Sequence, residues 1–448
     1  MTNAVLACYS LFNFSFPPPH VLFCRLPGPF LLPPFSLPPS LSFGLSHDHV
    51  RKTGSLVVAW TASQLSQLPA VLKANADAGD TSAVLLSRAE LLELEPALSA
   101  QALGGVYCPR EAVVEPFLVP ICYASSAIAN GADIRTGIEV VSAGFDGPSK
   151  VWEVETRETG EAAVGRSEPG ELLVKKPPAA EAEAAERRGG LVRARTVINC
   201  AGLYGDHVEM LGGGGEVEKK KFTVTPRKGQ FVVFRPVPGA VCPEIIVEPV
   251  ATEITKGVIA WKTVYGNVVV GPTATDQDSK VDRSTDRETV ETLRKAGERM
   301  LPGLEGAEVL GTYSGLRPAT EHRDYQIYAN KERQWITVGG IRSTGLTASS
   351  GIGEHVGELW EDLAGVSPLK AFEGGSAKDG LLGVTAAANS PVPVNRNVTR
   401  CERVPSLKEL SDDYKKRGDG TILIHGRSVR VTHPISSFGM GSFGIEKK

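Results

Sequence analysis

The stretch Arg195-Thr196-Val197-Ile198-Asn199-Cys200-Ala201-Gly202-Leu203-Tyr204-Gly205-Asp206 decides the fold of this chain. Its β-branched run ends in small residues, and apolar Val208 and Leu211 follow. This pattern predicts a buried strand that leads through a tight turn into a helix. In open α/β sheets, ligands bind beyond the carboxyl ends of the strands. Ala201 and Gly202 are small enough for a flat ring or a pyrophosphate to touch the backbone there; ordinary sheet packing is the other interpretation.

A second stretch, Trp335-Ile336-Thr337-Val338-Gly339-Gly340-Ile341-Arg342-Ser343-Thr344-Gly345-Leu346-Thr347, repeats this order of strand, glycines and helix. Apolar residues then recur every three or four positions from Ala348 to Leu363, which predicts a helix with one apolar face. Its first turn carries no carboxylate, and Glu354 is the earliest acid. A helix N-terminus carries about half a positive charge, so this one is left available to an electron-rich group.

The two stretches together resemble the FAD-dependent oxidoreductases of the D-amino-acid-oxidase type, especially the glycerol-3-phosphate dehydrogenase and 2-hydroxyglutarate oxidase-like branch. The likeness runs from about His47 to about Leu363. Three further stretches resemble the same branch: T-P-R-K-G-Q-F at 225–231, G-N-V-V-V-G-P-T at 266–273 and S-G-L-R-P at 314–318.

The resemblance implies FAD as the cofactor, with the first stretch beside it and the helix of the second stretch facing its isoalloxazine ring. The cofactor-binding residues that it implies are Asn199, Ala201, Gly202, Gly340, Ser343, Thr344, Gly345, Leu346 and Thr347. It also implies a β-α-β unit with G-x-G-x-x-G before His47, where glycines admit the pyrophosphate. Residues 1–46 contain only Gly28 and Gly44, so we expect this unit to be missing.

The expected fold class is therefore α/β (α+β), with an incomplete FAD-binding Rossmann-like domain and a mainly antiparallel-sheet substrate domain. High proline content predicts disorder at the N-terminus, because proline breaks helices and removes donors from sheets. The expected divisions are a Pro-rich leader (1–46), a segment shared between the two domains (47–130), a part of the FAD-binding domain (131–221) with a charged, solvated insertion (157–190), the substrate domain (222–334), the C-terminal strand and helix of the FAD-binding domain (335–372) and a tail (373–448).

Composition restricts the partners and the metal chemistry. Charged residues make up 22% of the chain and the net charge is −3, which indicates no nucleic-acid partner. No apolar run reaches the roughly 20 residues of a transmembrane helix. Seven cysteines (8, 24, 108, 122, 200, 242 and 401) form no C-x-x-C pair, so we expect no metal site and no iron–sulfur cluster. Free thiols favour a reducing compartment, and we expect the mitochondrion or the cytoplasm.

Two arginines are the candidates for catalysis. Arg317, in S-G-L-R-P at a strand end, suits bidentate binding of a carboxylate or phosphate. Its other interpretation is a surface arginine that pairs with Glu321. Arg342 lies in the loop before the second helix, where it suits a substrate anion or the charge of a reduced flavin. A plain ion pair with a helix acid is the alternative for Arg342.

Other charged residues are weaker candidates. Arg227 and Lys228 flank Gly229 and would form a basic entrance that attracts anions, or they are simply solvated. His322 and His355 are candidates for a base, although both also suit ordinary polar roles. Glu115 is expected to cap a helix at about 117–129.

The resemblance implies a FAD-dependent oxidoreductase that oxidises a small anionic substrate: glycerol 3-phosphate, a 2-hydroxy acid or an amino acid. Hydride would pass to the flavin and electrons then to a quinone or oxygen. The alternative is a truncated, non-catalytic relative that lacks the dinucleotide-binding motif and acts at most as an interaction protein. A nicotinamide-dependent dehydrogenase is a third hypothesis, which the motif series does not support.

Overall fold

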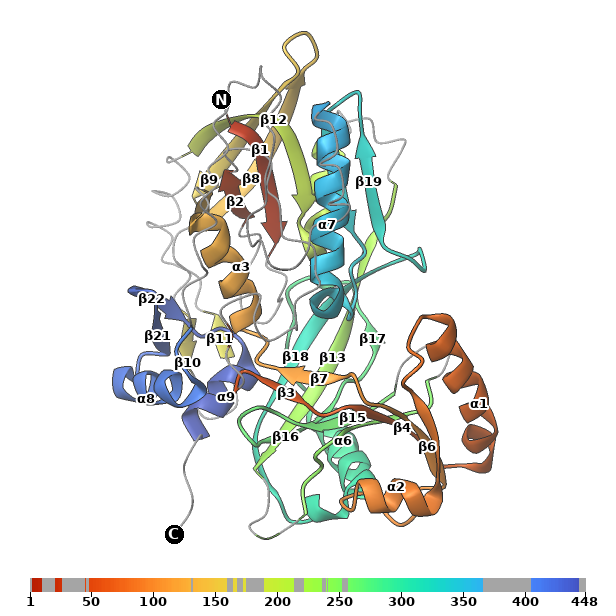
Figure 1. Cartoon of the computed structure of the whole chain (residues 1–448). Coiled ribbons are helices and arrows are strands. Elements are labelled where there is room, and N and C mark those ends of the chain that lie inside the picture. The colour runs from red at the N-terminus through yellow and green to blue at the C-terminus, as the bar shows by residue number, and fades with distance from the viewer. Residues whose placement is uncertain are drawn as a thin grey trace, which may run out of the picture.

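The computed structural model describes residues 2–9, 21–25, 45, 48–129, 132–158, 164–166, 172–174, 189–212, 221–235, 239, 241–251, 257–365 and 404–442. Two large sheets organise them, one in the upper and one in the lower half of Figure 1, with a small C-terminal module at the side. No helix among these residues is both long and apolar enough to cross a membrane.

The upper sheet has seven strands in the order β1-β2-β8-β9-β12-β20-β19. Its strands are β1 (Thr2–Tyr9), β2 (Val21–Arg25), β8 (Asp133–Asp146), β9 (Val151–Glu158), β12 (Gly189–Cys200), β19 (Gln326–Asn330) and β20 (Trp335–Gly339). β12 runs parallel to both β1 and β20. Because β1 pairs with β2 as well as β12, five of the strands form a closed ring. The predicted buried strand at 196–200 is the end of β12.

The structure differs from the disorder expected for residues 1–46 at β1 and β2. Both segments are free of proline, since the first proline of the chain is Pro17 and the next group begins at Pro27. Their backbones can therefore donate to a sheet, and they pair with β12 and β8. Within the charged insertion, β10 (Val164–Arg166) pairs with β11 (Leu172–Val174). The other residues of the leader and most of the insertion lie outside the described residues.

The lower sheet has nine strands, and all its pairings are antiparallel except that of β14 with β4. Its path is β17-β13-β16-β15-β14-β4-β6-β5, and β18 pairs with β13. Its strands are β4 (Ser55–Ala59), β5 (Val84–Ser87), β6 (Gly104–Cys108), β13 (Val224–Arg235), β14 (Ile246–Pro249), β15 (Ile259–Lys262), β16 (Val268–Gly271), β17 (Thr275–Asp276) and β18 (Glu308–Thr320). The expected mainly antiparallel sheet is thus present, and residues 47–130 contribute three of its strands.

Helices cover this lower sheet. α1 (Ala62–Asp77) and α2 (Arg88–Leu94) pack beside β5 and β6, and α6 (Arg287–Met300) packs on β13 and β16, followed by the short η3 (Pro302–Leu304). The side chains of Leu293, Met300 and Leu301 join Val232 and Val270 in the largest buried apolar cluster. The sequence predicts helical segments at 61–76, at 88–95 and near 286–301, and α1, α2 and α6 lie within one residue of these ranges.

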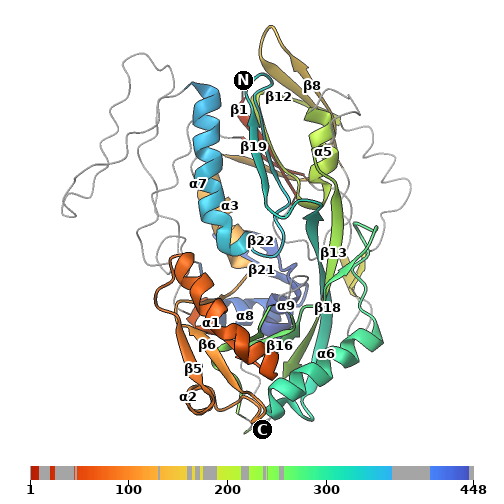
Figure 2. The same cartoon turned by 90° about the vertical axis from the view of Figure 1, so that its right-hand side faces the viewer.

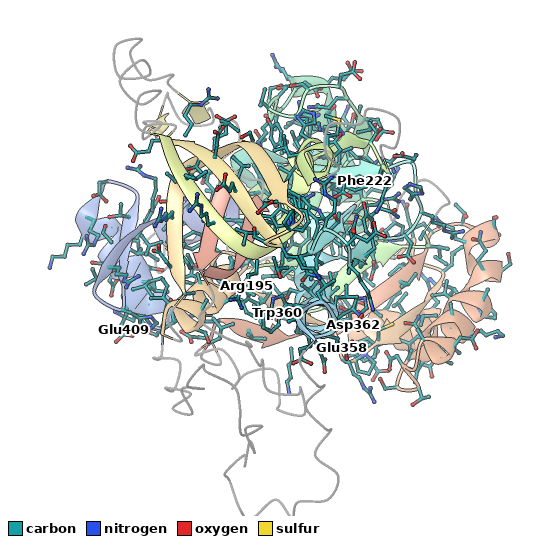
Figure 3. The ribbon with its side chains drawn as sticks, turned by 90° about the horizontal axis from the view of Figure 1, so that it is seen from above. Arg195, Phe222, Glu358, Trp360, Asp362 and Glu409 are labelled. Carbon is teal, nitrogen blue, oxygen red and sulfur yellow. The ribbon has the colours of Figure 1, made fainter. Side chains whose placement is uncertain are left out.

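The upper sheet has α5 (Gly205–Gly212) on one face and α7 (Gly345–Ala364) on the other, as Figure 2 shows. Alternate residues of the strands divide between the two faces. Val197 and Trp335 join the cluster under α5, whereas Ile198 and Ile336 join the cluster under α7. Figure 3 labels one residue from each face: Phe222, which packs against Gly205 of α5, and Trp360 of α7.

The C-terminal module consists of α8 (Leu407–Arg417), β21 (Thr421–Ile424), β22 (Arg427–Arg430) and α9 (Pro434–Ser442). It packs against α3 (Leu118–Ala129) and Tyr265 through one buried cluster. The two-stranded sheet of β3 (Val50–Lys52) and β7 (Ala112–Val114) lies next to it. Residues 404–442 thus fold as a unit docked on the rest of the chain.

Candidate functional site

The two glycine-containing strand ends meet in space. Asn199 of β12 pairs directly with Thr337 of β20 in parallel register, so the backbone after both strands leaves the sheet at one edge. Gly202, in the short η1 (Gly202–Tyr204), has a φ of 52° and Gly340 has a φ of 67°. These are left-handed conformations that favour glycine. The two stretches, which the resemblance places beside one cofactor, therefore converge at one edge of the upper sheet.

The side chain of Asn199 holds the turn that follows β12. Its Nδ2 donates to the carbonyl of Gly205 at 2.8 Å, and its Oδ1 accepts from the amide of Ala201 at 3.1 Å. Asn199 is fully buried. Both polar ends of this side chain are thus engaged within the chain, so Asn199 shapes the backbone at Ala201 and Gly202 rather than offering its amide to a ligand.

The N-terminus of α7 points to the same edge and has no capping side chain. Its N-cap residue, Thr344, makes no capping hydrogen bond, and the first turn contains no acid. The hydroxyl of Thr344 instead bonds to that of Tyr325. A Cβ at Gly345 would lie 2.8 Å from Ile341, so the first helical position needs a glycine. Ser343 and Thr347 are exposed and Leu346 is half-buried. This end of α7 keeps its partial positive charge.

Arg317 is a half-buried cation with no acidic partner among the described residues. Its Nη2 donates to the carbonyl of Thr273 at 3.2 Å. Burial and the neighbouring Arg227 lower the pKa of Arg317. The carboxylate of Glu321 accepts instead from the backbone amide of Thr223 at 2.9 and 3.1 Å, so the alternative of an Arg317–Glu321 pair is wrong.

The strand β13 provides room for this guanidinium. Arg227 and Gly229 of β13 lie opposite Arg317 and Gly315 of β18. A Cβ at Gly229 would lie 2.5 Å from the Nη2 atom of Arg317, so only glycine leaves the guanidinium its place. Arg227 itself binds Asp276 through two hydrogen bonds, at 2.6 and 2.9 Å. Arg227 therefore forms an ion pair, whereas Arg317 forms none with the described residues and can bind an external anion.

The strand that carries Arg317 ends at the edge where β12 and β20 end. Thr320, three residues later in β18, lies 3.5 Å from the Cβ position of Gly340. Arg342 donates to the carbonyls of Thr320 and His322 and so connects the loop after β20 to the end of β18. The alternative of an ion pair with a helix acid does not apply to Arg342. Arg342 therefore holds the two loops together, and its charge lowers the pKa of Asp276 as one of several causes, behind Arg227.

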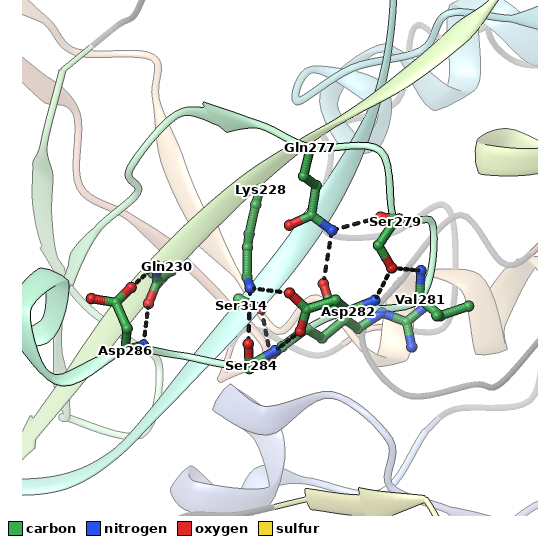
Figure 4. A network of polar contacts seen from close by, with 10 residues as sticks. Lys228, Gln230, Gln277, Ser279, Val281, Asp282, Ser284, Asp286 and Ser314 are labelled. Carbon is green, nitrogen blue, oxygen red and sulfur yellow. Dashed lines mark hydrogen bonds and ion pairs between the residues drawn. The ribbon is translucent and has the colours of Figure 1, made fainter.

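Lys228 points to the other side of β13, into a polar network (Figure 4). Its Nζ donates to Asp282 at 2.9 Å and to the hydroxyl of Ser284 at 3.1 Å. Gln230 exchanges hydrogen bonds with Asp286 in the same network. Lys228 is buried and paired, so it is not part of an exposed basic entrance.

The histidine candidates have ordinary polar roles. The Nε2 of His322 donates to the carbonyl of Lys221 at 2.9 Å, and His355 lies 3.5 Å from Glu358 on the surface of α7. Glu115 caps α3, as expected, by accepting from the amide of Leu118 at 2.8 Å.

Sequence reasoning missed Glu209 of α5. Its carboxylate lies under the paired strand ends and accepts hydrogen bonds from Trp335, Thr337 and Tyr328. The sequence offered one signal: Glu209 directly follows Val208, whose side chain is buried in the cluster between α5 and the upper sheet. That signal is weak, because an acid at this place in a helix is more often solvated.

Comparisons with known proteins agree with this geometry. A family model described as "FAD dependent oxidoreductase" matches residues 42–359. A glycerol 3-phosphate dehydrogenase of Caloramator mitchellensis is 24% identical over 315 residues, which cover 70% of this chain and 58% of that protein. A glycerol 3-phosphate oxidase of Mycoplasma pneumoniae is 28% identical over 310 residues, which cover 67% of this chain and 71% of that protein. The chain thus spans less than two thirds of the first of these relatives.

Solved structures show the same fold. The dithionite-reduced L-α-glycerophosphate oxidase of Mycoplasma pneumoniae with FAD bound superposes with a TM-score of 0.55 at 26% identity, over 70% of this chain and 73% of that one. Glycine oxidase of Bacillus cereus gives a TM-score of 0.54 at 18% identity, over 72% and 76% of the two chains.

Proposed function

This chain belongs to the FAD-dependent oxidoreductase family, and on that premise we propose that it oxidises a small anionic substrate. The observation that carries the proposal is Arg317, a half-buried guanidinium without an acidic partner among the described residues, on the strand β18 whose last residue, Thr320, lies next to Gly340. Glycerol 3-phosphate, a 2-hydroxy acid and an amino acid all carry the anionic group that such a guanidinium binds.

The residues at this edge fit a flavin. The backbone at Ala201, Gly202 and Gly340 projects no bulky side chain, and the uncapped N-terminus of α7 provides a positive end. The residues that would hold the cofactor are Ala201, Gly202, Gly340 and the segment 343–347, while Asn199 orients the first of them. When bound, FAD supplies the hydride acceptor and passes electrons on to a quinone or oxygen.

The chain's own residues then bind and orient the substrate. Arg317 would hold the anionic group through two parallel hydrogen bonds, a geometry that a planar guanidinium favours. Arg227 stays paired with Asp276, so it does not compete with Arg317 for the anion. Arg342 keeps the loop before α7 fixed to the end of β18. No observation on the described residues favours the non-catalytic alternative, and we do not propose it.

The test is a purified full-length chain titrated with FAD and then assayed with glycerol 3-phosphate, 2-hydroxyglutarate and glycine. We expect flavin absorbance and activity with one of these anions. Arg317→Ala should raise KM roughly 10- to 100-fold, since a hydrogen bond to a charged group contributes about 1.5–3 kcal/mol. The KM of Arg317→Lys should lie between those of the wild type and Arg317→Ala, because lysine keeps the positive charge but lacks the planar guanidinium.

Arg235→Ala is the matched control, because Arg235 lies at the far end of β13 and pairs with Glu308 at 3.0 Å. It should leave KM unchanged. A chain that binds no FAD, or an Arg317→Ala variant with wild-type KM, contradicts the proposal.

A further inference from the structure

Glu209 lies on the side of the upper sheet opposite α7, under the two strand ends. We propose that Glu209 is a positioning residue that aligns the backbone of the β12 and β20 ends for the flavin. This inference rests on the proposed function, since it concerns the same edge. Glu209 itself lies on α5 and need not touch the cofactor.

Four donors converge on this one carboxylate. The hydroxyl of Tyr328 donates at 2.8 Å, the Nε1 of Trp335 at 3.2 Å and the Nδ2 of Asn199 at 3.5 Å; the hydroxyl of Thr337 donates as well. Oε1 accepts from Tyr328 and Oε2 from the other three donors, so both oxygens of the carboxylate are engaged within the chain. No lysine or arginine in the described part of the chain forms an ion pair with Glu209.

Three of the donors form a single row across three strands. Asn199 of β12 lies opposite Thr337 of β20, and Thr337 lies opposite Tyr328 of β19. Residues in one such row project from the same face of a sheet. Glu209 therefore bonds to one side chain of each of the three strands, at the edge where β12 and β20 end.

The contact with Asn199 extends this effect to the turn. The Nδ2 of Asn199 donates to the carboxylate of Glu209 as well as to the carbonyl of Gly205. Because both acceptors hold the Nδ2 end of the amide, its Oδ1 faces the amide of Ala201. If the amide of Asn199 rotated, Ala201 would lose its partner and the backbone of Gly202 would lose its orientation. Glu209 thus acts on the candidate flavin contacts through Asn199.

The packing of α5 keeps the carboxylate in place. A Cβ at Gly212 would lie 2.5 Å from the ring of Trp335, and Gly205 faces Phe222 at 3.8 Å. Glycine at Gly212 therefore lets α5 approach the sheet closely. The environment is also poor in solvent, since burial and, after it, Glu209 raise the pKa of Tyr328 far above its usual value. In such surroundings, unpaired donors are costly.

The experiment compares the full chain with Glu209→Gln and Glu209→Ala, and with Glu358→Gln as a control on an exposed helix acid that pairs only with His355 in the described residues. The readouts are the dissociation constant of FAD, the visible circular dichroism of the bound flavin and hydrogen exchange of the amides of 201–205. A purely structural role would lower the urea midpoint but leave the flavin spectrum unchanged.

We expect Glu209→Ala to weaken FAD binding at least 10-fold, to change the flavin spectrum and to speed exchange at 201–205. Glu209→Gln keeps one acceptor oxygen, so its FAD affinity and its exchange rates should lie between those of the wild type and Glu209→Ala. If the alanine variant does not fold, the glutamine variant decides the test. Glu358→Gln should match the wild type. Variants of Glu209 with wild-type FAD affinity and spectrum overturn this inference alone; a wild-type chain that binds no FAD overturns the proposed function and this inference together.

Discussion

Replacing Glu115 by glutamine should make the stability of this protein less dependent on pH. Glu115 is fully buried between α3 and the C-terminal module. Its carboxyl group accepts from the amide of Leu118, and it bonds to the hydroxyls of Ser436 and, at 3.3 Å, Tyr265. Burial raises the pKa of Glu115 from 4.5 to about 7, although these hydrogen bonds oppose the rise.

The sign of the effect follows from linkage. The pKa of Glu115 is higher in the folded state, so its contribution to stability is fully present below pH 4.5 and is lost as the pH rises through about 7. A rise of about 2.5 units, at roughly 1.36 kcal/mol per unit, amounts to about 3 kcal/mol. The wild type should lose about that much stability from this group, whereas glutamine cannot ionise and still offers one acceptor and one donor.

The assay is urea unfolding of both proteins at pH 5, 6, 7 and 8, with hydrogen exchange of residues 404–442 to follow the docked module. The stability of Glu115→Gln minus that of the wild type should grow by between about 2 and 3 kcal/mol from pH 5 to pH 8, with most of the change between pH 5 and 7, because part of the contribution is already lost at pH 5. Glu111→Gln, at an exposed position, is the control and should show no such trend. A difference that is constant with pH, or that shrinks as the pH rises, would refute the reasoning.

Three further substitutions test single contacts at the site and elsewhere in the fold. Gly229→Ala places a Cβ 2.5 Å from the guanidinium of Arg317 and should raise the KM for an anionic substrate while FAD affinity is retained; an unchanged KM would show that this space is not needed. Asp206→Ala removes the buried carboxylate that pairs with the half-buried Lys280 at 2.7 Å and accepts from the amide of Val224, and it should cost about 1–3 kcal/mol in urea unfolding, part of which Lys280→Met in the same chain should recover; an unchanged stability would contradict this role of Asp206. Gly439→Ala places a Cβ 2.1 Å from an aromatic ring and should cost about 1–3 kcal/mol and speed hydrogen exchange in the C-terminal module, whereas Gly441→Ala, where no atom is close, should not.

Local patterns determined the elements of this chain. The helices expected at 61–76, 88–95 and 286–301 correspond to α1, α2 and α6, because apolar spacing and turn residues act within a few positions of the chain. The same local signals placed the strand ends and the helix start that are shared with the family. Average composition was less reliable. The high proline content of residues 1–46 predicted disorder, although β1 and β2 within this segment contain no proline and form strands.

The partners of individual side chains were decided by the tertiary structure. Sequence alone nominated Arg317, but only the fold shows that Glu321 is bonded elsewhere and that Gly229 makes room for the guanidinium. Glu209 meets Thr337 from 128 positions away, and Glu115 meets Ser436 from 321 positions away. A residue's helix or strand preference depends on its neighbours in the chain, whereas the charge and hydrogen bonds of a buried group depend on whatever the folded chain brings beside it.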